Sequence, residues 1–267
     1  MRLGTCSSAI TNAAILAASD VDFVEENVQT FLCPANSDEA AWNTRLSAAR
    51  ACGKPIQAAN CFLPASLPCV GPQVDHHAIH AWAATAFRRA EQAGIAIIVF
   101  GSGGSRRIPA DFDAQEAKRQ FIDLLRKLAP MAEAHHVTLV IEPLNVKECN
   151  FINSLDEGAA IVRAVASPGV RLLADTFHMI CERESPAAIV RAGSLLAHVH
   201  VAGPQRVPPT MNGHDFRPYF RALTDAGYSG MISIEASWSA LASQLAPATV
   251  ELREQAATAA LTMTTCV

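Results

Sequence analysis

The 267-residue chain lacks long apolar runs, an excess of positive charge and paired cysteine motifs. Its longest apolar runs, such as IAIIVF, are far too short to cross a bilayer, so we expect no membrane span. A net charge of −4 and a pI near 6.1 provide no electrostatic surface for nucleic acid. The eight cysteines form no C-x-x-C pair, and we expect reduced thiols. The opening residues MRLGTCSSAI do not resemble a secretory signal, so we expect a soluble, cytoplasmic protein.

Short apolar runs alternate with helical patterns along the whole chain. Half of the residues are hydrophobic and 17% are charged, which is enough apolar material for a large core. Expected strands span residues 2–6, 22–28, 55–63, 95–101, 137–144, 170–177, 197–202 and 230–236. Expected helices span residues 11–19, 38–52, 75–93, 114–135, 154–166, 185–196, 215–226 and 239–262. Eight such pairs predict one (β/α)8 barrel domain over residues 1–267. The competing fold is an open doubly wound sheet, but no G-x-G-x-x-G turn follows the first strand.

Four acidic or imidazole side chains stand at the ends of four consecutive expected strands. They are Glu142 in LVIEPLN, Asp175 in RLLADTFH, His200 in AHVHVAG and Glu235 in MISIEAS. Each gap suits one strand–helix unit of roughly 30 residues. Taken singly, the glutamates could be structural ion-pair partners and the aspartate a helix N-cap. At one height in a barrel the four would converge, and they predict a site for one divalent cation, with Mn²⁺, Mg²⁺ or Co²⁺ favoured over thiolate-seeking metals.

Further polar side chains lie close to these four in the sequence. His178 follows Asp175 by one bend and can point into the same pocket. His198 shares a strand face with His200, and we expect it to lie in the core behind the ligand. Arg206 lies in a proline-bounded loop, where it either reaches over the barrel mouth or faces solvent.

A glycine-rich segment, GSGGSRRIP, follows the fourth expected strand over residues 101–109. It is not a P-loop, because no G-K-[ST] sequence follows its glycines. Arg106 and Arg107 in this segment either neutralise an anionic substrate group or face solvent.

The motifs IEPLN, DTFHM, HVHVAGPQR and ISIEA resemble the xylose-isomerase-like TIM barrels of the sugar isomerase/epimerase group. The resemblance covers residues 95–238 approximately and is strongest to the ketose 3-epimerase and hydroxypyruvate isomerase branch. It implies that Glu142 and Glu235 both bind the metal and shuttle the proton, while Asp175 and His200 complete the metal tetrad.

The resemblance also implies how a substrate is held. His178 and Arg206 match residues that contact the carbonyl side of the substrate, and Glu148 matches a carboxylate that contacts its terminal hydroxyl. The first strand departs from the family pattern, since it ends in Cys6-Ser7-Ser8 without the aromatic residue that often floors the ketohexose pocket.

The implied function is a divalent-metal-dependent isomerase or epimerase of a small keto sugar or hydroxy-keto acid. Its chemistry is proton transfer through a metal-stabilised enediolate. The alternative is a metal-dependent lyase that dehydrates an inosose-like substrate on the same fold. An apurinic-site endonuclease is disfavoured by the negative charge, and a non-catalytic sugar-binding barrel would require lesions in the tetrad. A homo-oligomer is possible, because residues 239–262 carry more Ala and Leu than one helix face needs.

Overall fold

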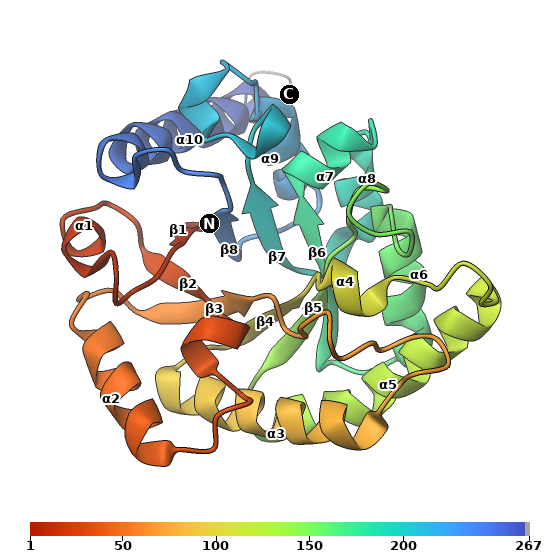
Figure 1. The fold of residues 1–267 in the computed structure, drawn as a ribbon. Helices are drawn as coiled ribbons and strands as arrows, with labels where there is room; N and C mark the ends of the chain where they lie inside the picture. Colours follow the sequence, from red (N-terminus) through yellow and green to blue (C-terminus); the bar gives the residue numbers. More distant parts are fainter. Residues whose placement is uncertain (265–267) are drawn as a thin grey trace.

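A closed barrel of eight parallel strands forms the centre of the molecule (Figure 1). The computed structural model describes residues 1–264, with side chains described through residue 260. Each strand pairs with the next along the chain, and β8 pairs with β1 to close the barrel. The strands are β1 (Arg2–Cys6), β2 (Phe23–Asn27), β3 (Ile56–Asn60), β4 (Ile97–Phe100), β5 (Thr138–Ile141), β6 (Val170–Asp175), β7 (Leu196–Val201) and β8 (Met231–Ile234). This closure confirms the predicted (β/α)8 fold and excludes the open sheet.

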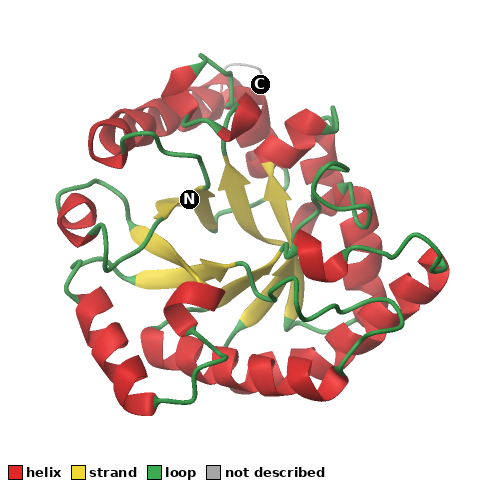
Figure 2. Cartoon of the chain, viewed as in Figure 1, coloured by secondary structure: helices red, strands yellow, loops and turns green. Residues whose placement is uncertain are grey.

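Helices surround the strands as an outer ring (Figure 2). They are α1 (Ala13–Ala17), α2 (Glu39–Arg50), α3 (His76–Ala93), α4 (Gly103–Arg106), α5 (Ala114–Ala134), α6 (Leu155–Val165), α7 (Thr176–Cys181), α8 (Ala187–Ala192), α9 (Arg217–Asp225) and α10 (Leu241–Thr264). Asp38, Asp75, Asp113 and Ser154 each cap a long helix by accepting a hydrogen bond from its first turn.

Some expected boundaries are wrong at the carboxyl ends of strands. The strand expected over 170–177 ends at Asp175, because the side chain of this residue caps α7 directly. The strand expected over 55–63 ends at Asn60, since Cys61 has a φ of 58°, a left-handed conformation that terminates extended backbone. The helix α4 and a π-helical turn over Val28–Leu32 were not anticipated. All of these differences lie on the face where the connecting loops begin.

The barrel interior has an apolar lower layer. This layer consists of Phe23, Ala58, Ile97, Val99, Val140, Leu173 and Met231. Gly4 makes room for the largest of these side chains, because a Cβ atom there would lie 2.5 Å from the Phe23 ring. Above this layer, toward the carboxyl ends of the strands, the interior side chains become polar.

Outside the barrel, the helices pack on the strands through a second apolar layer. A continuous row of aromatic rings runs through it from the β3 loop to the β5 loop. Phe62 contacts Phe87 and Phe100, Phe100 contacts Phe121, and Phe121 contacts Phe151, with ring centroids 5.1–5.6 Å apart. The row fixes α3 and α5 against the strands that carry the neighbouring loops.

The last helix, α10, packs beside α9 and outside β1 and β8 (Figure 1). Arg253 of α10 also donates hydrogen bonds to the backbone oxygen of Asp20 and to the Asp22 carboxylate. This packing accounts for the apolar residues of the helix as a cover for the closing strands. None of the described helices is long and apolar enough to cross a membrane. The seven cysteines in the described part of the chain are free, and Cys266 lies outside it.

We predict that Phe121→Ala lowers the free energy of unfolding by about 3–5 kcal/mol, because it removes a fully buried ring that joins two aromatic neighbours. Denaturant unfolding followed by circular dichroism measures the change. Lys127→Ala, on the exposed side of the same helix, is the control and should have little effect. Equal stability of the two variants would show that the aromatic row is not a main support of this sector.

Candidate active site

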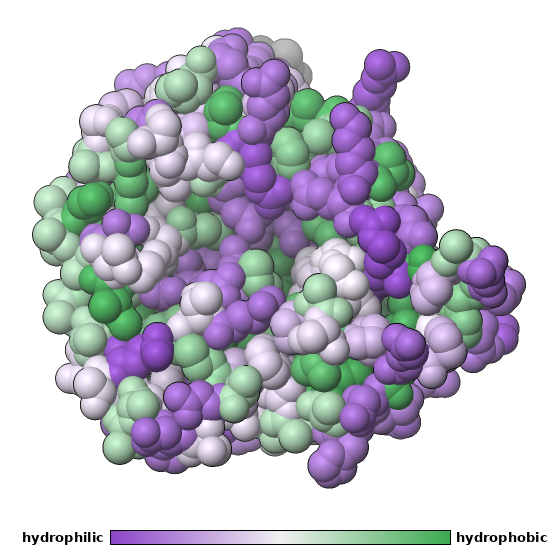
Figure 3. Space-filling model, viewed as in Figure 1, coloured by the Kyte–Doolittle hydropathy of each residue, from purple (hydrophilic) through white to green (hydrophobic). Residues whose placement is uncertain are grey.

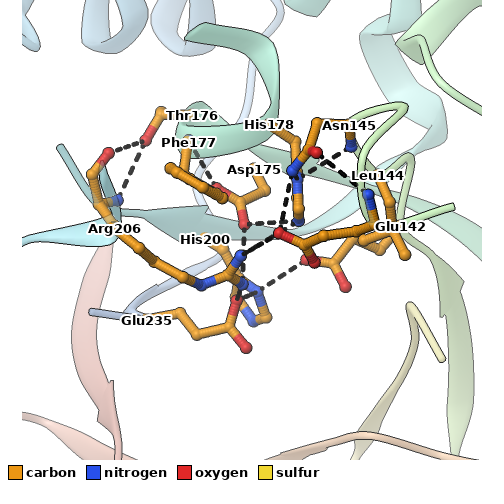
Figure 4. Close-up of polar contacts among 12 residues, drawn as sticks. Glu142, Leu144, Asn145, Asp175, Thr176, Phe177, His178, His200, Arg206 and Glu235 are labelled. Atoms are coloured by element: carbon orange, nitrogen blue, oxygen red, sulfur yellow. Dashed lines mark hydrogen bonds and ion pairs between the residues drawn. The ribbon is translucent and has the colours of Figure 1, made fainter. Parts of the chain in front are cut away.

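The structure brings the four predicted ligand residues together at the carboxyl ends of β5 to β8. Glu142 and Glu235 directly follow β5 and β8, Asp175 ends β6, and His200 lies near the end of β7. One donor atom from each lies within 4.8 Å of the others (Figure 4). In the space-filling view, hydrophilic side chains gather in the hollow at the centre of this face (Figure 3). A groove of about 480 Å³ lies elsewhere, between α5 and α6, and none of the four residues lines it.

Local backbone features make room for the carboxylates. A Cβ atom at residue 101 would lie 2.1 Å from the Glu142 carboxylate, so Gly101 leaves the space that this side chain fills. Asp175 has two roles, because its Oδ1 accepts a hydrogen bond of 2.7 Å from the Phe177 backbone and caps α7. Its Oδ2 is buried and accepts no hydrogen bond. The nearest positive charge is Arg206 Nη2, 3.6 Å from this oxygen. A buried carboxylate oxygen that accepts no hydrogen bond fits a cation ligand, because such an oxygen is costly to bury without a close partner.

His200 is fully buried and connects the tetrad to the barrel interior. Its Nδ1 lies 3.2 Å from Glu142 Oε1 and 3.0 Å from Glu235 Oε2, while its Nε2 lies 2.9 Å from Glu25 Oε1. Burial alone disfavours the charged ring, but Glu25, Glu235 and Glu142 outweigh it and raise the pKa of His200 well above its usual value. Burial likewise opposes ionisation of Glu235, but His200 and Arg206 lower its pKa to about 2. The donors are thus three carboxylates and one imidazole.

His178 presents an N–H group to the same space. Its Nδ1 accepts a hydrogen bond of 3.0 Å from the backbone N–H of Asn145, so a neutral ring carries its proton on Nε2. That Nε2 lies 3.7 Å from Asp175 Oδ2 and 3.4 Å from Arg206 Nη1 (Figure 4). The side-chain amide of Asn145 also donates to Glu148 Oε1 at 2.9 Å, which places Glu148 on the rim of the same pocket.

Arg206 reaches the mouth and does not face solvent. Its Nη2 pairs with Glu235 Oε2, its Nη1 lies 3.6 Å from Glu148 Oε1, and its guanidinium carbon lies 4.7 Å from the Phe177 ring centroid. Gln205 and Arg206 have φ angles of 64° and 58°, a left-handed pair that costs energy for residues with a Cβ atom. The Arg206 carbonyl accepts a hydrogen bond of 2.7 Å from the Ser237 backbone, which ties the β7 loop to the β8 loop.

The two arginines of the glycine-rich segment do not face the tetrad as anion-binding groups. Arg106 is fully buried, and its Nη2 donates a hydrogen bond of 2.8 Å to the backbone oxygen of Glu142. Arg107 is exposed and donates to the backbone oxygen of Glu148. Both therefore support the chain at β5. The expectation that these arginines face solvent is wrong for Arg106, which is fully buried, and it is confirmed for Arg107.

Several side chains at the site were not identified from the sequence. Glu25 bonds both histidines of β7, and Asn60 donates a hydrogen bond of 2.9 Å to Glu235 Oε1. Cys6 lies beside Glu25 and His200, and burial raises the pKa of its thiol well above the usual value, so it stays protonated. The one available signal was the pair of adjacent glutamates inside the expected strand DFVEENV, which would be unusual in a buried strand without polar partners.

The chain belongs to the xylose isomerase-like TIM barrel family, whose model matches residues 13–261. It is 35% identical to a D-psicose 3-epimerase of Ruminiclostridium cellulolyticum over 115 residues, or 43% of this chain and 39% of the relative. It is 30% identical to a 2-oxo-tetronate isomerase of Cupriavidus necator over 132 residues, or 48% of this chain and 51% of the relative. These alignments thus span about half or less of each relative's length.

A solved structure of D-psicose 3-epimerase with D-tagatose, from Clostridium cellulolyticum, has the same fold. The superposition has a TM-score of 0.78 at 23% identity and covers 97% of this chain and 96% of that one. At this level of identity the likeness establishes only the shared barrel fold. The chemistry has to be inferred from the residues at the mouth of the barrel.

We predict that binding of Mn²⁺ to the tetrad releases about one proton near neutral pH, because His200 must free the Nδ1 lone pair that its raised pKa keeps protonated. Apparent affinity should therefore increase with pH until the pH passes the pKa of His200. Calorimetric titration in buffers of different ionisation enthalpy counts the protons. Binding that is independent of pH and of buffer would exclude His200 as a ligand.

Proposed function

We propose that the protein is an enzyme that isomerises or epimerises a small keto sugar or hydroxy-keto acid, and that it depends on one divalent cation. The observation that carries this proposal is the convergence of Glu142, Asp175, His200 and Glu235, with a buried carboxylate oxygen of Asp175 left without a hydrogen bond. Membership in the family supports the proposal, and so do the activities named for the two relatives that align with part of the chain.

The donor set favours Mn²⁺, Mg²⁺ or Co²⁺ as the cation. Three carboxylates and one imidazole are harder ligands than thiolates, and the nearby Cys6 thiol stays protonated. When bound, the cation would act as a Lewis acid that stabilises negative charge developing on the carbonyl side of the substrate.

The two glutamates are the proposed acid–base pair. They stand at opposite ends of the arc of strands from β5 to β8, so a substrate between them meets one carboxylate on each side. Glu142 or Glu235 would remove the proton next to the carbonyl, and the other would return one. Return to the same carbon from the opposite face gives an epimer, whereas return to the neighbouring carbon gives an isomer.

His178 and Arg206 would hold the oxygen on which charge develops. The Nε2–H of His178 and the guanidinium of Arg206 lie 3.4 Å apart and face the same space (Figure 4). A neutral imidazole N–H and a fixed cation both bind an enediolate oxygen more tightly than a ketose oxygen, which lowers the barrier. Glu148 on the rim would accept a hydrogen bond from a hydroxyl farther along the substrate.

We predict that Glu142→Gln and Glu235→Gln each reduce solvent deuterium exchange at the substrate carbon next to the carbonyl by about 10²–10⁴-fold, because each removes one proton carrier. Proton NMR in D₂O with unphosphorylated ketoses and 2-oxo-tetronate measures the exchange, and metal analysis of each variant separates loss of the cation from loss of the base.

Glu182→Gln provides the control, because this carboxylate lies on the rim and accepts a hydrogen bond from the Val146 backbone without touching the tetrad. It should exchange at the wild-type rate. Unchanged exchange in both tetrad variants would end the proposed mechanism, and a product that has lost the mass of water would identify a dehydratase instead.

We predict that Arg206→Ala lowers kcat by about 10²–10³-fold and raises KM by less, because the guanidinium stabilises charge that appears only during the reaction. Cation binding should survive, since the four ligands belong to strand ends and not to the Arg206 loop. Lys147→Ala removes a positive charge from the same rim and is the control. Steady-state kinetics and calorimetry decide the matter, and a near wild-type kcat or a lost cation would contradict the assigned role.

A further inference from the structure

The Glu25 carboxylate lies inside the barrel, beneath the tetrad, and contacts both histidines of β7. Its Oε1 lies 2.9 Å from His200 Nε2, and its Oε2 lies 2.8 Å from His198 Nε2. All three side chains are at most 1% exposed. Because β1 and β8 separate β2 from β7 in the barrel, the contact crosses the interior and is not made between paired strands.

The surroundings of Glu25 explain why it must accept these hydrogen bonds. The apolar layer with Phe23 lies below, and the Phe23 ring is 6.4 Å from that of His198. No arginine or lysine is within ion-pair distance of Glu25 among the described residues. Ser233 Oγ lies 3.3 Å from His198 Nε2 and adds a fourth polar group to the cluster. A buried carboxylate without an arginine or lysine partner depends on other donors, so the two imidazole N–H groups are its main compensation.

This arrangement decides which nitrogen of His200 a cation in the tetrad would meet. A carboxylate only accepts hydrogen bonds, so Nε2 of His200 carries its proton toward Glu25, and Nδ1 is the nitrogen that faces Glu142 and Glu235. We infer that Glu25 is a positioning residue that fixes the tautomer and ring orientation of His200 and thereby sets the affinity of the tetrad for its divalent cation. The inference rests on the proposed cation site.

The strands are irregular where they hold this cluster. The β6–β7 register shifts immediately before His198, and the β2–β3 register shifts immediately before Glu25. Such irregularities redirect side chains next to functional sites. A different role, in which Glu25 joins Cys6 as a second cation site, is disfavoured because both carboxylate oxygens already accept imidazole hydrogen bonds.

Calorimetric titration of the full chain with Mn²⁺ tests the inference. Glu25→Leu should weaken binding by about 10–100-fold, the usual effect of removing a carboxylate behind a histidine ligand. Glu25→Gln keeps the shape and can accept only one of the two hydrogen bonds, so it should give a smaller loss. Circular dichroism verifies that each variant is folded. Wild-type affinity in folded Glu25→Leu, or in Glu25→Gln if the leucine variant does not fold, would overturn the inference.

Glu26→Gln is the matched control. Glu26 is the next residue of β2 and is also buried, but its Oε1 accepts a hydrogen bond from the Ala9 backbone on the other side of the strand. The change should affect stability without affecting Mn²⁺ affinity. An equal loss of affinity in Glu26→Gln and Glu25→Gln would show that burial of a carboxylate in β2, and not its contact with His200, is what matters.

Proton NMR of the Co²⁺-loaded protein reports directly on the His200 Nε2 proton, so it separates the contact with Glu25 from a general loss of stability. The wild type should show a hyperfine-shifted imidazole N–H resonance that exchanges slowly with D₂O, because Glu25 holds the His200 Nε2 proton in the interior. Glu25→Leu should exchange this proton faster, and Glu26→Gln should not. Absence of the resonance in the wild type would overturn the assigned tautomer, whereas failure of the wild type to bind Mn²⁺ or Co²⁺ would overturn the cation site itself.

Discussion

The burial of several carboxylates at one point is the constraint on which the rest of this barrel depends. Glu25, Glu142 and Asp175 are each at most 5% exposed, and Glu235 is close by. Carboxylates in such a place repel one another and lose their hydration, so the chain must supply positive charge or N–H groups from within. The barrel interior is therefore built in levels, with an apolar layer at the bottom, Glu25 and the β7 histidines above it, and the tetrad at the mouth.

The groups that compensate the buried carboxylates come both from regular strands and from an irregular loop. Strand ends hold His200 and the carboxylates. The absence of a Cβ atom at Gly101 lets the Glu142 carboxylate lie against the backbone. The positive charge of Arg206 comes instead from a loop with two consecutive left-handed residues, whose conformation is held by a hydrogen bond to the β8 loop. Such a strained backbone is typical of a functional residue, and here it places the Arg206 guanidinium over the mouth of the barrel.

The sequence predicted the strand order and the convergence of the tetrad because both depend on short-range patterns repeated at regular spacing. It did not predict α7, because Asp175 ends a strand and caps a helix at the same position, and the capping role leaves no periodic signal. It did not predict Glu25 as a partner of His198 and His200, because that contact joins residues more than 170 positions apart across a closed barrel. A pattern along one strand cannot indicate which distant side chain it will meet.

The proposed chemistry and the choice of substrate depend on different parts of the barrel. The proposed proton transfer uses two carboxylates, a cation and an oxygen-binding group at fixed positions, and strand ends supply most of these. The outcome depends on which substrate carbon lies between Glu142 and Glu235, and that is set by side chains from the loops and from strands on the other side of the mouth, such as Cys6, Asn60 and Glu148. Because none of these three residues is one of the four proposed cation ligands, they can differ between barrels that share the chemistry. Cys6 of β1 lies beside Glu25 and His200, and Asn60 of β3 bonds Glu235, so substrate selection in this protein should be sought on the β1 and β3 side of the mouth.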